Sequence, residues 1–367
     1  MKISTYILKR VIQIIPMLIA VTVFAFALTN LSGGDPAEIA VRNTGAQVTP
    51  ENVEAMRIEL GLDKPLIVQY LLWLKGAFML DFGNSYVSGK PALEEIMTRF
   101  PNTLFLVLVA SIIAIGVAIP LALIAVRRPN GIVDHIIRVI TIIGVSMPEF
   151  WIGLLLLYIF SVNLGVAPVI AGSNYAYVWL PAITMSIGYS CIYIRMLRAN
   201  LIEVSNSLYI KAARAKGMTK ETALIRHGLR NSILPCLTLV ATNFGGMISG
   251  SFAVESIFTW NGVAGYAINS VKSKDFAVIQ CYLMIIALAY IIINLTVDII
   301  YMFVDPKIRL QRDTGRKAWK AMTFASGKKK KNVTAKNPFP NGTGDVGIPG
   351  TAENVAGENM GGKHEKE

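Results

Sequence analysis

The chain has 367 residues, of which 53% are hydrophobic and only 16% are charged. Because a soluble domain carries roughly a quarter charged residues, this composition excludes an ordinary soluble domain and indicates an integral membrane protein. The net charge of +12 suits nucleic acid, anionic lipid or a membrane-topology signal, and its distribution along the chain decides among these.

Six apolar runs are long enough to span a bilayer, which takes about 20 residues to cross roughly 30 Å of hydrocarbon. They cover residues 11–31, 102–126, 139–162, 181–201, 236–258 and 278–304. The sequence therefore predicts an all-α integral membrane protein with six transmembrane helices. Lys2, Lys9 and Arg10 resemble the charged start of a cleavable signal, but the apolar core that follows is too long, so we expect a retained first helix.

Positive charge is concentrated in a few connecting segments. Residues 127–138 hold three Arg and one Asp, and residues 195–230 hold eight Lys or Arg against two Glu. Residues 32–99 hold six Lys or Arg against nine Asp or Glu, and residues 164–180 hold no charge. The positive-inside rule then places both termini in the cytoplasm of a multi-pass cell-membrane protein. Topology thus accounts for the charge, so we expect membrane lipid and no nucleic acid as a partner.

The runs divide the chain into four parts. Residues 1–31 form an N-terminal transmembrane helix, and residues 32–100 form an extracytoplasmic segment with short helices at 51–60 and 66–79. Residues 101–304 form the transmembrane core, which contains a cytoplasmic loop at 205–235. Residues 305–367 are basic and too poor in apolar side chains to form a core, so we expect a largely disordered cytoplasmic tail.

Motifs of catalysis or cofactor binding are missing from the sequence. None of the Gly-Lys pairs is followed by the Ser or Thr of a phosphate-binding loop, and H-E-x-x-H and G-x-S-x-G do not occur. His135, His227 and His364 are scattered, and the three cysteines show no C-x-x-C spacing. We therefore expect no catalytic residue, no metal site and no cofactor bound by this chain.

Several polar residues lie inside the apolar runs. Glu149 follows Pro148, and an ionisable group at membrane depth is costly to desolvate. Either Glu149 has a specific function, or a kink at the proline brings it to a water-filled cavity or a helix partner without a specific role, and the sequence leaves these two interpretations about equal. In the fifth run small residues recur at every fourth position, which allows close helix packing. Its polar neighbours indicate that this helix also lines a path or a subunit contact. The candidate path residues are Glu149, Thr242, Asn243, Gly246 and Glu255.

The basic loop at 205–235 has the pattern of a helix, a turn and a second helix. Residues 208–216 favour a helix, which Gly217 is expected to end. Thr219 can cap the next helix, with Glu221 in its first turn. The small residues Ala212, Ala213 and Gly217 would permit close approach by a partner. Topology alone would explain the charge of this loop, but not this register of small residues.

These residues resemble the EAA loop of ATP-binding-cassette (ABC) importer permeases, the cytoplasmic segment that binds the ATPase subunit. Further motifs are GDPA at 34–37, LGLDKPL at 60–66, QYLLWLKG at 69–76, DFGNSY at 81–86, RFPNTL at 99–104, MPEFWIG at 147–153, VESIFTWNGVAGY at 254–266 and DPKIRL at 305–310. Over residues 1–311 the chain resembles binding-protein-dependent permeases of the peptide and nickel class, most of all the first-type (B) subunit of oligopeptide or dipeptide importers. Lys211 in place of the usual Glu, and the long spacing from Gly217 to Pro235, are typical of that branch.

The resemblance implies a type I (MetI-like) importer permease fold with an extracytoplasmic cap between the first two helices. It implies a bacterial membrane subunit that is not an enzyme, a second permease subunit, two cytoplasmic ATPase subunits that hold ATP and Mg, and an extracytoplasmic peptide-binding protein. The alternative function is import of nickel or another small solute, and a membrane-embedded enzyme or channel is a third, less favoured interpretation. The residues expected to couple to the ATPases are Tyr209, Ala212, Ala213, Arg214, Lys216 and Gly217.

Overall fold

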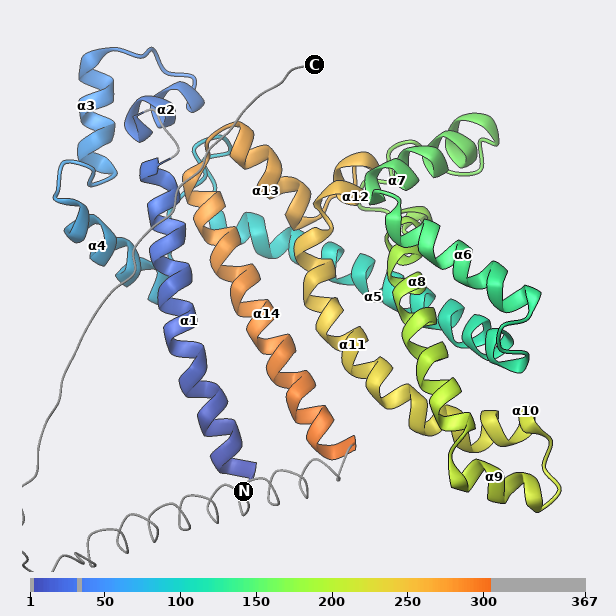
Figure 1. The fold of residues 1–367 in the computed structure, drawn as a ribbon. Helices are drawn as coiled ribbons and strands as arrows, with labels where there is room; N and C mark the ends of the chain where they lie inside the picture. Colours follow the sequence, from blue (N-terminus) through green and yellow to red (C-terminus); the bar gives the residue numbers. More distant parts are fainter. Residues whose placement is uncertain (1–2, 32–34, 305–367) are drawn as a thin grey trace, which may run out of the picture. The chain divides into compact units, whose positions relative to one another are not determined.

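The computed structural model describes residues 3–31 and 35–304, and this part of the chain is helical without a β-strand, which confirms the all-α class. In chain order the helices are α1 (Ile3–Leu31), α2 (Pro36–Asn43), α3 (Pro50–Glu59), α4 (Leu66–Phe78), α5 (Ala92–Arg127), α6 (Ile132–Ser146), α7 (Glu149–Leu157), α8 (Trp179–Ser205), α9 (Leu208–Ala215), α10 (Lys220–Ala223), α11 (Leu229–Gly250), α12 (Phe252–Ile257), α13 (Val263–Lys272) and α14 (Phe276–Val304) (Figure 1). The predicted tail at 305–367 lies outside the described residues.

Length and apolar composition select four membrane-spanning helices among the described residues, or five if one bent pair counts as a span. The four are α5, α8, α14 and a continuous helix from Lys220 to Gly250 that contains α10 and α11. The first apolar run lies on α1, where the described apolar stretch, Ile12–Leu28, is shorter. The predicted count of six is therefore not confirmed, although each predicted run lies on helical structure.

The third apolar run is not one continuous helix. α6 ends at Ser146, α7 begins at Glu149, and the two axes are bent by 100°. Met147 is extended, with φ −78° and ψ 130°, because a following proline disfavours the helical conformation. The fifth run is also divided, since α11 ends at Gly250 and α12 begins after Ser251. The break between α6 and α7 makes Glu149 the first residue of the short helix α7.

The predicted outer segment, residues 32–100, contains α2, α3 and α4, and the last two match the short helices expected from sequence. α5 begins at Ala92, inside this segment. Buried Asp275, between α13 and α14, accepts hydrogen bonds from the Ser85 hydroxyl at 2.5 Å and the Tyr86 amide at 3.2 Å. Burial, with the Asp275 charge as a smaller cause, raises the pKa of Tyr86 to about 12. The chain before α5 is therefore fixed to the start of α14.

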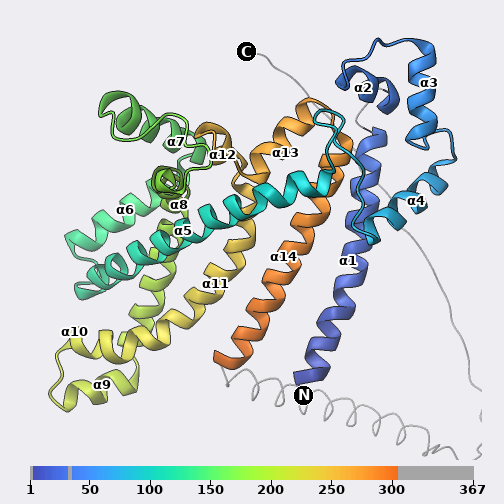
Figure 2. The same cartoon turned by 180° about the vertical axis from the view of Figure 1, so that it is seen from behind.

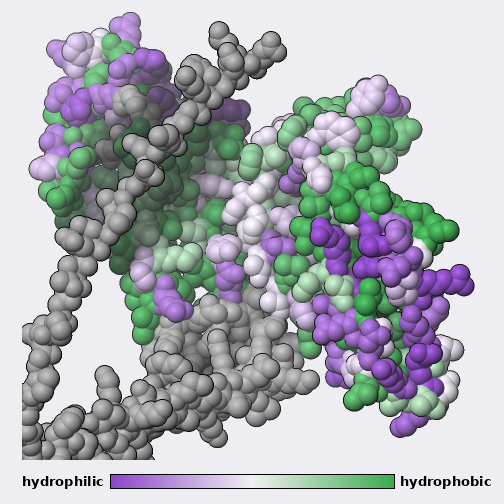
Figure 3. All heavy atoms as spheres, viewed as in Figure 1, coloured by the Kyte–Doolittle hydropathy of each residue, from purple (hydrophilic) through white to green (hydrophobic). Residues whose placement is uncertain are grey.

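The helices divide between two ends of the structure described by residues 3–304. α9 and α10 lie at the same end as the start of α1 and the finish of α14, whereas α2, α3, α12 and α13 lie at the other end (Figures 1 and 2). Hydrophilic side chains gather over α2 and α3 and again around α9 and α10, with hydrophobic side chains between them (Figure 3). This arrangement fits a basic loop at one membrane surface and the outer segment at the other.

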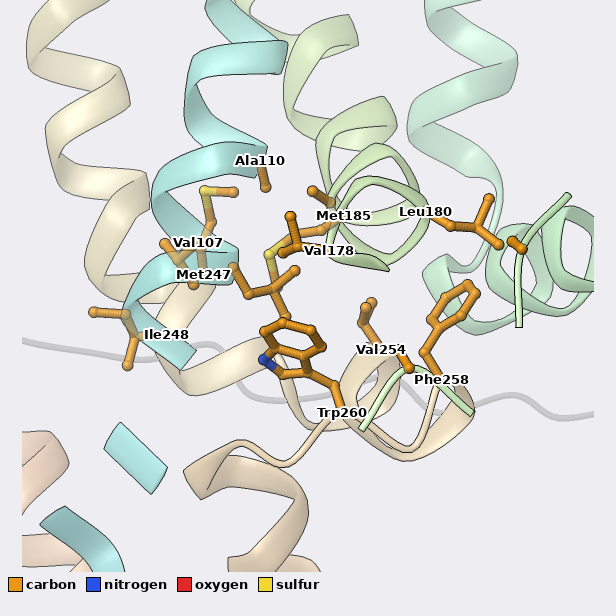
Figure 4. Packing of buried hydrophobic residues seen from close by; sticks show 14 residues of the cluster. Val107, Ala110, Val178, Leu180, Met185, Met247, Ile248, Val254, Phe258 and Trp260 are labelled. Carbon is orange, nitrogen blue, oxygen red and sulfur yellow. The ribbon is translucent and has the colours of Figure 1, made fainter. Parts of the chain in front are cut away.

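Apolar side chains from α5, α8, α11 and α12 pack together around Trp260, whose Nε1 donates to the Asn102 carbonyl at 3.1 Å (Figure 4). Beside this cluster the Glu255 side chain is almost completely buried. It accepts from the Thr103 hydroxyl at 2.6 Å, the Ser251 hydroxyl at 2.8 Å and the Gly265 amide at 2.7 Å. Because the first amides of a helix have no partner within it, this carboxylate caps α13 and joins it to α5 and α12.

Gly262 leaves the space that the Glu255 carboxylate occupies, since a Cβ there would lie 2.3 Å from its carboxyl carbon. We expect Gly262→Ala to displace the carboxylate from its donors and to destabilise the protein by about 1–3 kcal/mol, as overpacking does. The measurement is the apparent unfolding temperature of the purified membrane protein. Gly116→Ala is the control, because a Cβ at that α5 position meets nothing within 4 Å. Equal unfolding temperatures for the two variants would contradict this account of Glu255.

Candidate functional site

α9 is a short helix that follows α8 after a two-residue turn and is anchored by one buried side chain. Ile210 is fully buried, whereas Leu208 is 83% exposed and Tyr209 is 41% exposed. The predicted helix at 208–216 is confirmed by α9, whose last helical residue is Ala215. α9 therefore presents most of its surface outward from this chain.

Gly217 ends α9 in the way expected from sequence. Its φ is +91°, a left-handed conformation that side-chain-bearing residues rarely adopt. The Gly217 amide donates to the Arg214 carbonyl, and the Met218 amide donates to the Ala213 carbonyl at 3.3 Å, which satisfies carbonyls at the helix end. A Cβ at Gly217 would meet nothing within 4 Å. Glycine is thus required here for the backbone turn, and the space around it is open to a partner.

The second helix of the loop is the beginning of a spanning helix rather than a separate element. Thr219 caps α10, its hydroxyl accepting from the Thr222 amide at 3.2 Å, as predicted, with Glu221 in the first turn. α10 passes through a π-helical turn, Leu224–Gly228, directly into α11, and Pro235 lies inside α11. This half of the loop is therefore continuous with a membrane-spanning helix.

Side chains brace the loop against two spanning helices. The Lys220 ammonium donates to the carbonyls of Val126 and Arg127 at the end of α5, at 3.4 and 3.3 Å. Positive charge at a helix C-terminus is favourable because of the exposed carbonyls there. The Asn231 amide on α11 donates to the Tyr209 hydroxyl at 3.0 Å. α9 and α10 are thus fixed relative to α11 and α5.

The structure places the predicted coupling residues together on α9 and the turn that follows it. Ala213 is half-buried, and the others are exposed: Tyr209, Ala212, Arg214, Lys216 and Gly217. Lys211 adds a third exposed basic side chain to Arg214 and Lys216. Together they form a basic surface with small residues, and we name these residues, 208–217, the α9 surface.

The predicted path residues do not form one cluster. Thr242 and Gly246 are exposed on α11, and Asn243 beside them is half-buried. Glu149 begins α7, where its Oε1 is buried without a hydrogen bond of normal geometry among the described residues. Glu255 is enclosed at the junction of α5, α12 and α13, where its oxygens are occupied by donors of this chain. A role in the path stays a prediction for all five.

Two tyrosines on α8 link Glu149 to Asn243, and the sequence reasoning missed them. Tyr189 lies near Glu149, and its ring centroid lies 6.3 Å from that of Tyr193. The Tyr193 hydroxyl lies next to the Asn243 amide, and neither group has a hydrogen bond of normal geometry in the described part of the chain. Their spacing of four residues, which places both on one helix face, was the available signal. On α8 they lie between the candidate path residues Glu149 on α7 and Asn243 on α11.

Metal-binding side chains do not gather within residues 3–31 and 35–304, where no group of three or more His, Cys, Asp or Glu is close enough to hold an ion. Cys191, Cys236 and Cys281 are buried and free.

Comparison with known proteins gives matches over nearly the whole described chain. Residues 114–310 match the family described as "Binding-protein-dependent transport system inner membrane component", and residues 3–107 match its N-terminal companion family. The glutathione transport system permease protein GsiC of Escherichia coli K12 is 34% identical over 304 residues, which cover 83% of this chain and 98% of that protein. GsiC of Salmonella choleraesuis gives the same identity and coverage.

Among solved structures, an amino acid ABC transporter with histidines is 20% identical, with a TM-score of 0.45, and the match covers 58% of this chain and 94% of that one. The family match and the identity to GsiC confirm the resemblance drawn from the motifs. They make the chain a multi-pass inner-membrane permease subunit of an ABC importer rather than an enzyme. The chain therefore belongs to the family of binding-protein-dependent transport system inner membrane components.

Proposed function

We propose that this chain forms part of the membrane path for oligopeptides or dipeptides and transmits the ATPase cycle to that path. The exposed α9 surface with its Gly217 turn is the observation that carries the coupling role. The cargo proposal is supported by the relatives, which are named for transport of glutathione, itself a peptide. The binding protein of such a system delivers the cargo, and the permease supplies the route.

The proposed assembly contains a second permease subunit, two cytoplasmic ATPase subunits that hold ATP and Mg, and an extracytoplasmic peptide-binding protein. Thr242 and Gly246 support the second subunit, because a polar and a small residue exposed on a spanning helix suit a protein contact or a water-filled path better than lipid. In this arrangement both termini and α9 are cytoplasmic. In the described part of the chain, the start of α1, the finish of α14 and α9 lie at the same end (Figure 2).

Coupling follows from how the loop is attached. An ATPase surface that closes on α9 moves its small, basic face, and α9 is connected to α8 by its backbone and to α11 by the Tyr209–Asn231 hydrogen bond. Lys220 adds a link to the end of α5. A displacement at the cytoplasmic surface is thereby distributed to three spanning helices, since rigid helices transmit motion as units.

The cargo class is tested by transport into proteoliposomes that contain the complete importer. We expect ATP-dependent uptake of a labelled dipeptide or oligopeptide when its binding protein is added, and none when this chain is omitted. Uptake of Ni²⁺ that the peptides fail to compete would replace the peptide proposal by the nickel alternative.

The coupling role is tested by Gly217→Asp. The new residue must adopt a left-handed φ and projects a side chain into the space proposed for the ATPase, so we expect the variant to insert normally and to lose more than about 90% of uptake, which corresponds to ~1.4 kcal/mol or more. Co-purification of the ATPase subunits should fall in parallel.

Gly45→Asp is the matched control, because Gly45 has φ +77° and equally open surroundings but lies after α2. It should keep its ATPase subunits despite similar backbone strain. Normal uptake by a well-inserted Gly217→Asp importer would refute the coupling role.

A further inference from the structure

A buried ion pair joins α6 to α8. Asp134 in the first turn of α6 has a fully buried side chain and accepts from Arg198 Nε at 2.5 Å and Arg198 Nη2 at 2.6 Å. The same carboxylate accepts from the Asn130 amide at 2.8 Å, and Arg138 lies 3.9 Å away. Two parallel hydrogen bonds between a guanidinium and a carboxylate fix the relative orientation of the two side chains as well as their distance.

A second contact fixes the other end of α6 to α8. A Cβ at Gly144 would lie 2.5 Å from the Cys191 Sγ and 3.8 Å from its Cβ, so the helices touch there at a distance that only glycine allows. Thr141, one turn earlier, is also buried. α6 is therefore held along its length, by charge at its start and by backbone approach near its end.

The opposite side of α6 is covered by exposed apolar side chains, including Ile136, Val139, Ile140 and Ile143. Among the described elements α6 packs chiefly on α8 and to a smaller extent on α5. Its position in the structure thus depends mainly on α8.

The connections of these helices give the pair a place in the transport cycle. α8 continues into the α9 surface, and α6 continues into the 100° bend that places Glu149 at the start of α7. Building on the proposed function, we propose that α6 and α8 move as one rigid arm during transport, and that Asp134 and Arg198 are the positioning residues that make α6 follow α8. The arm connects the ATPase contact with the bend before α7.

Separating Asp134 from Arg198 is energetically costly, and this cost makes the contact between α6 and α8 specific. Removing one partner leaves a buried charge without compensation, which is strongly unfavourable, whereas an apolar replacement of both partners is often tolerated. The pair therefore acts as a specific connection between two helices more than as a source of net stability. Leucine or valine contacts at this point would let the helices slide, because apolar packing has no directional bond.

The first test locks the arm. In a protein with Cys236→Ala and Cys281→Ala, the substitution Gly144→Cys places a second thiol beside Cys191, and the 3.8 Å Cβ separation matches the mean of disulfides. We expect the disulfide to form, and we expect the oxidised and reduced importers to transport peptide at rates within about twofold, since helices that move together tolerate a crosslink. Loss of transport on oxidation with recovery on reduction, or failure of the disulfide to form, would overturn the rigid arm.

The control for the oxidant is Gly144→Cys combined with Cys191→Ala, which offers no thiol partner. Its transport should not respond to oxidation.

The second test releases the arm and then restores it. Asp134→Asn keeps the shape of the side chain but removes its charge, and we expect the peptide imported per ATP hydrolysed to fall roughly tenfold while hydrolysis continues. When Asp134→Asn is combined with Gly144→Cys, oxidation should restore most of the peptide imported per ATP hydrolysed, because the disulfide then joins α6 to α8 in place of the ion pair. A purely structural role would change the amount of folded complex, which co-purification of the ATPase subunits measures, and would leave the ratio unaffected.

The positioning role would be refuted if Asp134→Asn did not lower the peptide imported per ATP hydrolysed, or if oxidation did not restore it. Failure of the proposed function itself looks different, since the unsubstituted complex would then show no ATP-dependent peptide uptake at all.

Discussion

The described helices depend on one constraint: a carboxylate taken out of water must be given donors by the protein. Glu255, Asp275 and Asp134 are each buried, and each finds its donors on a different element. Glu255 joins α12 to α5 and α13, Asp275 joins residues 85–86 to the start of α14, and Asp134 joins α6 to α8. Apolar packing such as that around Trp260 (Figure 4) fills the space between helices. The three carboxylates fix which helix lies against which.

Interruptions of helices are the second determinant of the architecture. Pro148 separates α6 from α7, and Ser251 separates α11 from α12. After each interruption an acidic residue lies in the first turn of the next helix, Glu149 in α7 and Glu255 in α12, and Glu255 also accepts from the Gly265 amide of α13. Because helix starts carry unpaired amides and a partial positive charge, acidic residues are favoured there. Only Glu255 has its oxygens occupied, whereas Glu149 keeps an oxygen without a hydrogen bond of normal geometry.

The two ends of the described chain carry different features, which suit the proposed roles of a permease subunit. The α9 surface is exposed and basic, with small residues; α9 follows α8 after a two-residue turn and is hydrogen-bonded to α11, while Lys220 on α10 links the loop to α5. The opposite end carries the outer segment and α12 and α13, held by Asp275 and Glu255 (Figure 1). In the middle of the described chain, Tyr189 and Tyr193 on α8 lie between α7 and α11, the two helices that carry Glu149 and Asn243. In the proposed mechanism, motion imposed at the α9 end would reach the other end through these contacts.

The sequence by itself determined the features that depend on neighbouring residues. The helices at Pro50–Glu59, Leu66–Phe78 and Leu208–Ala215, the turn at Gly217 and the cap at Thr219 were all predicted, because backbone hydrogen bonds and caps act over a few residues. The apolar runs determined the all-α membrane class, and the motifs determined the family. The continuity of α10 with α11 was not foreseen, since the π-helical turn that joins them has no simple local signature.

Only the tertiary structure decided how the polar residues are used. A role of Glu255 in the path stays a prediction, and the structure gives its carboxylate a donor, Thr103, that stands 152 residues away in sequence. Asp134 and Arg198 gave no sign of pairing across 64 residues, and the bend at Pro148 had a predictable place but not a predictable angle of 100°. The count of spans also depended on that bend. Local sequence fixes where a helix begins and ends, but the partner of a buried charge is set by which helices pack together, and that is a property of the whole fold.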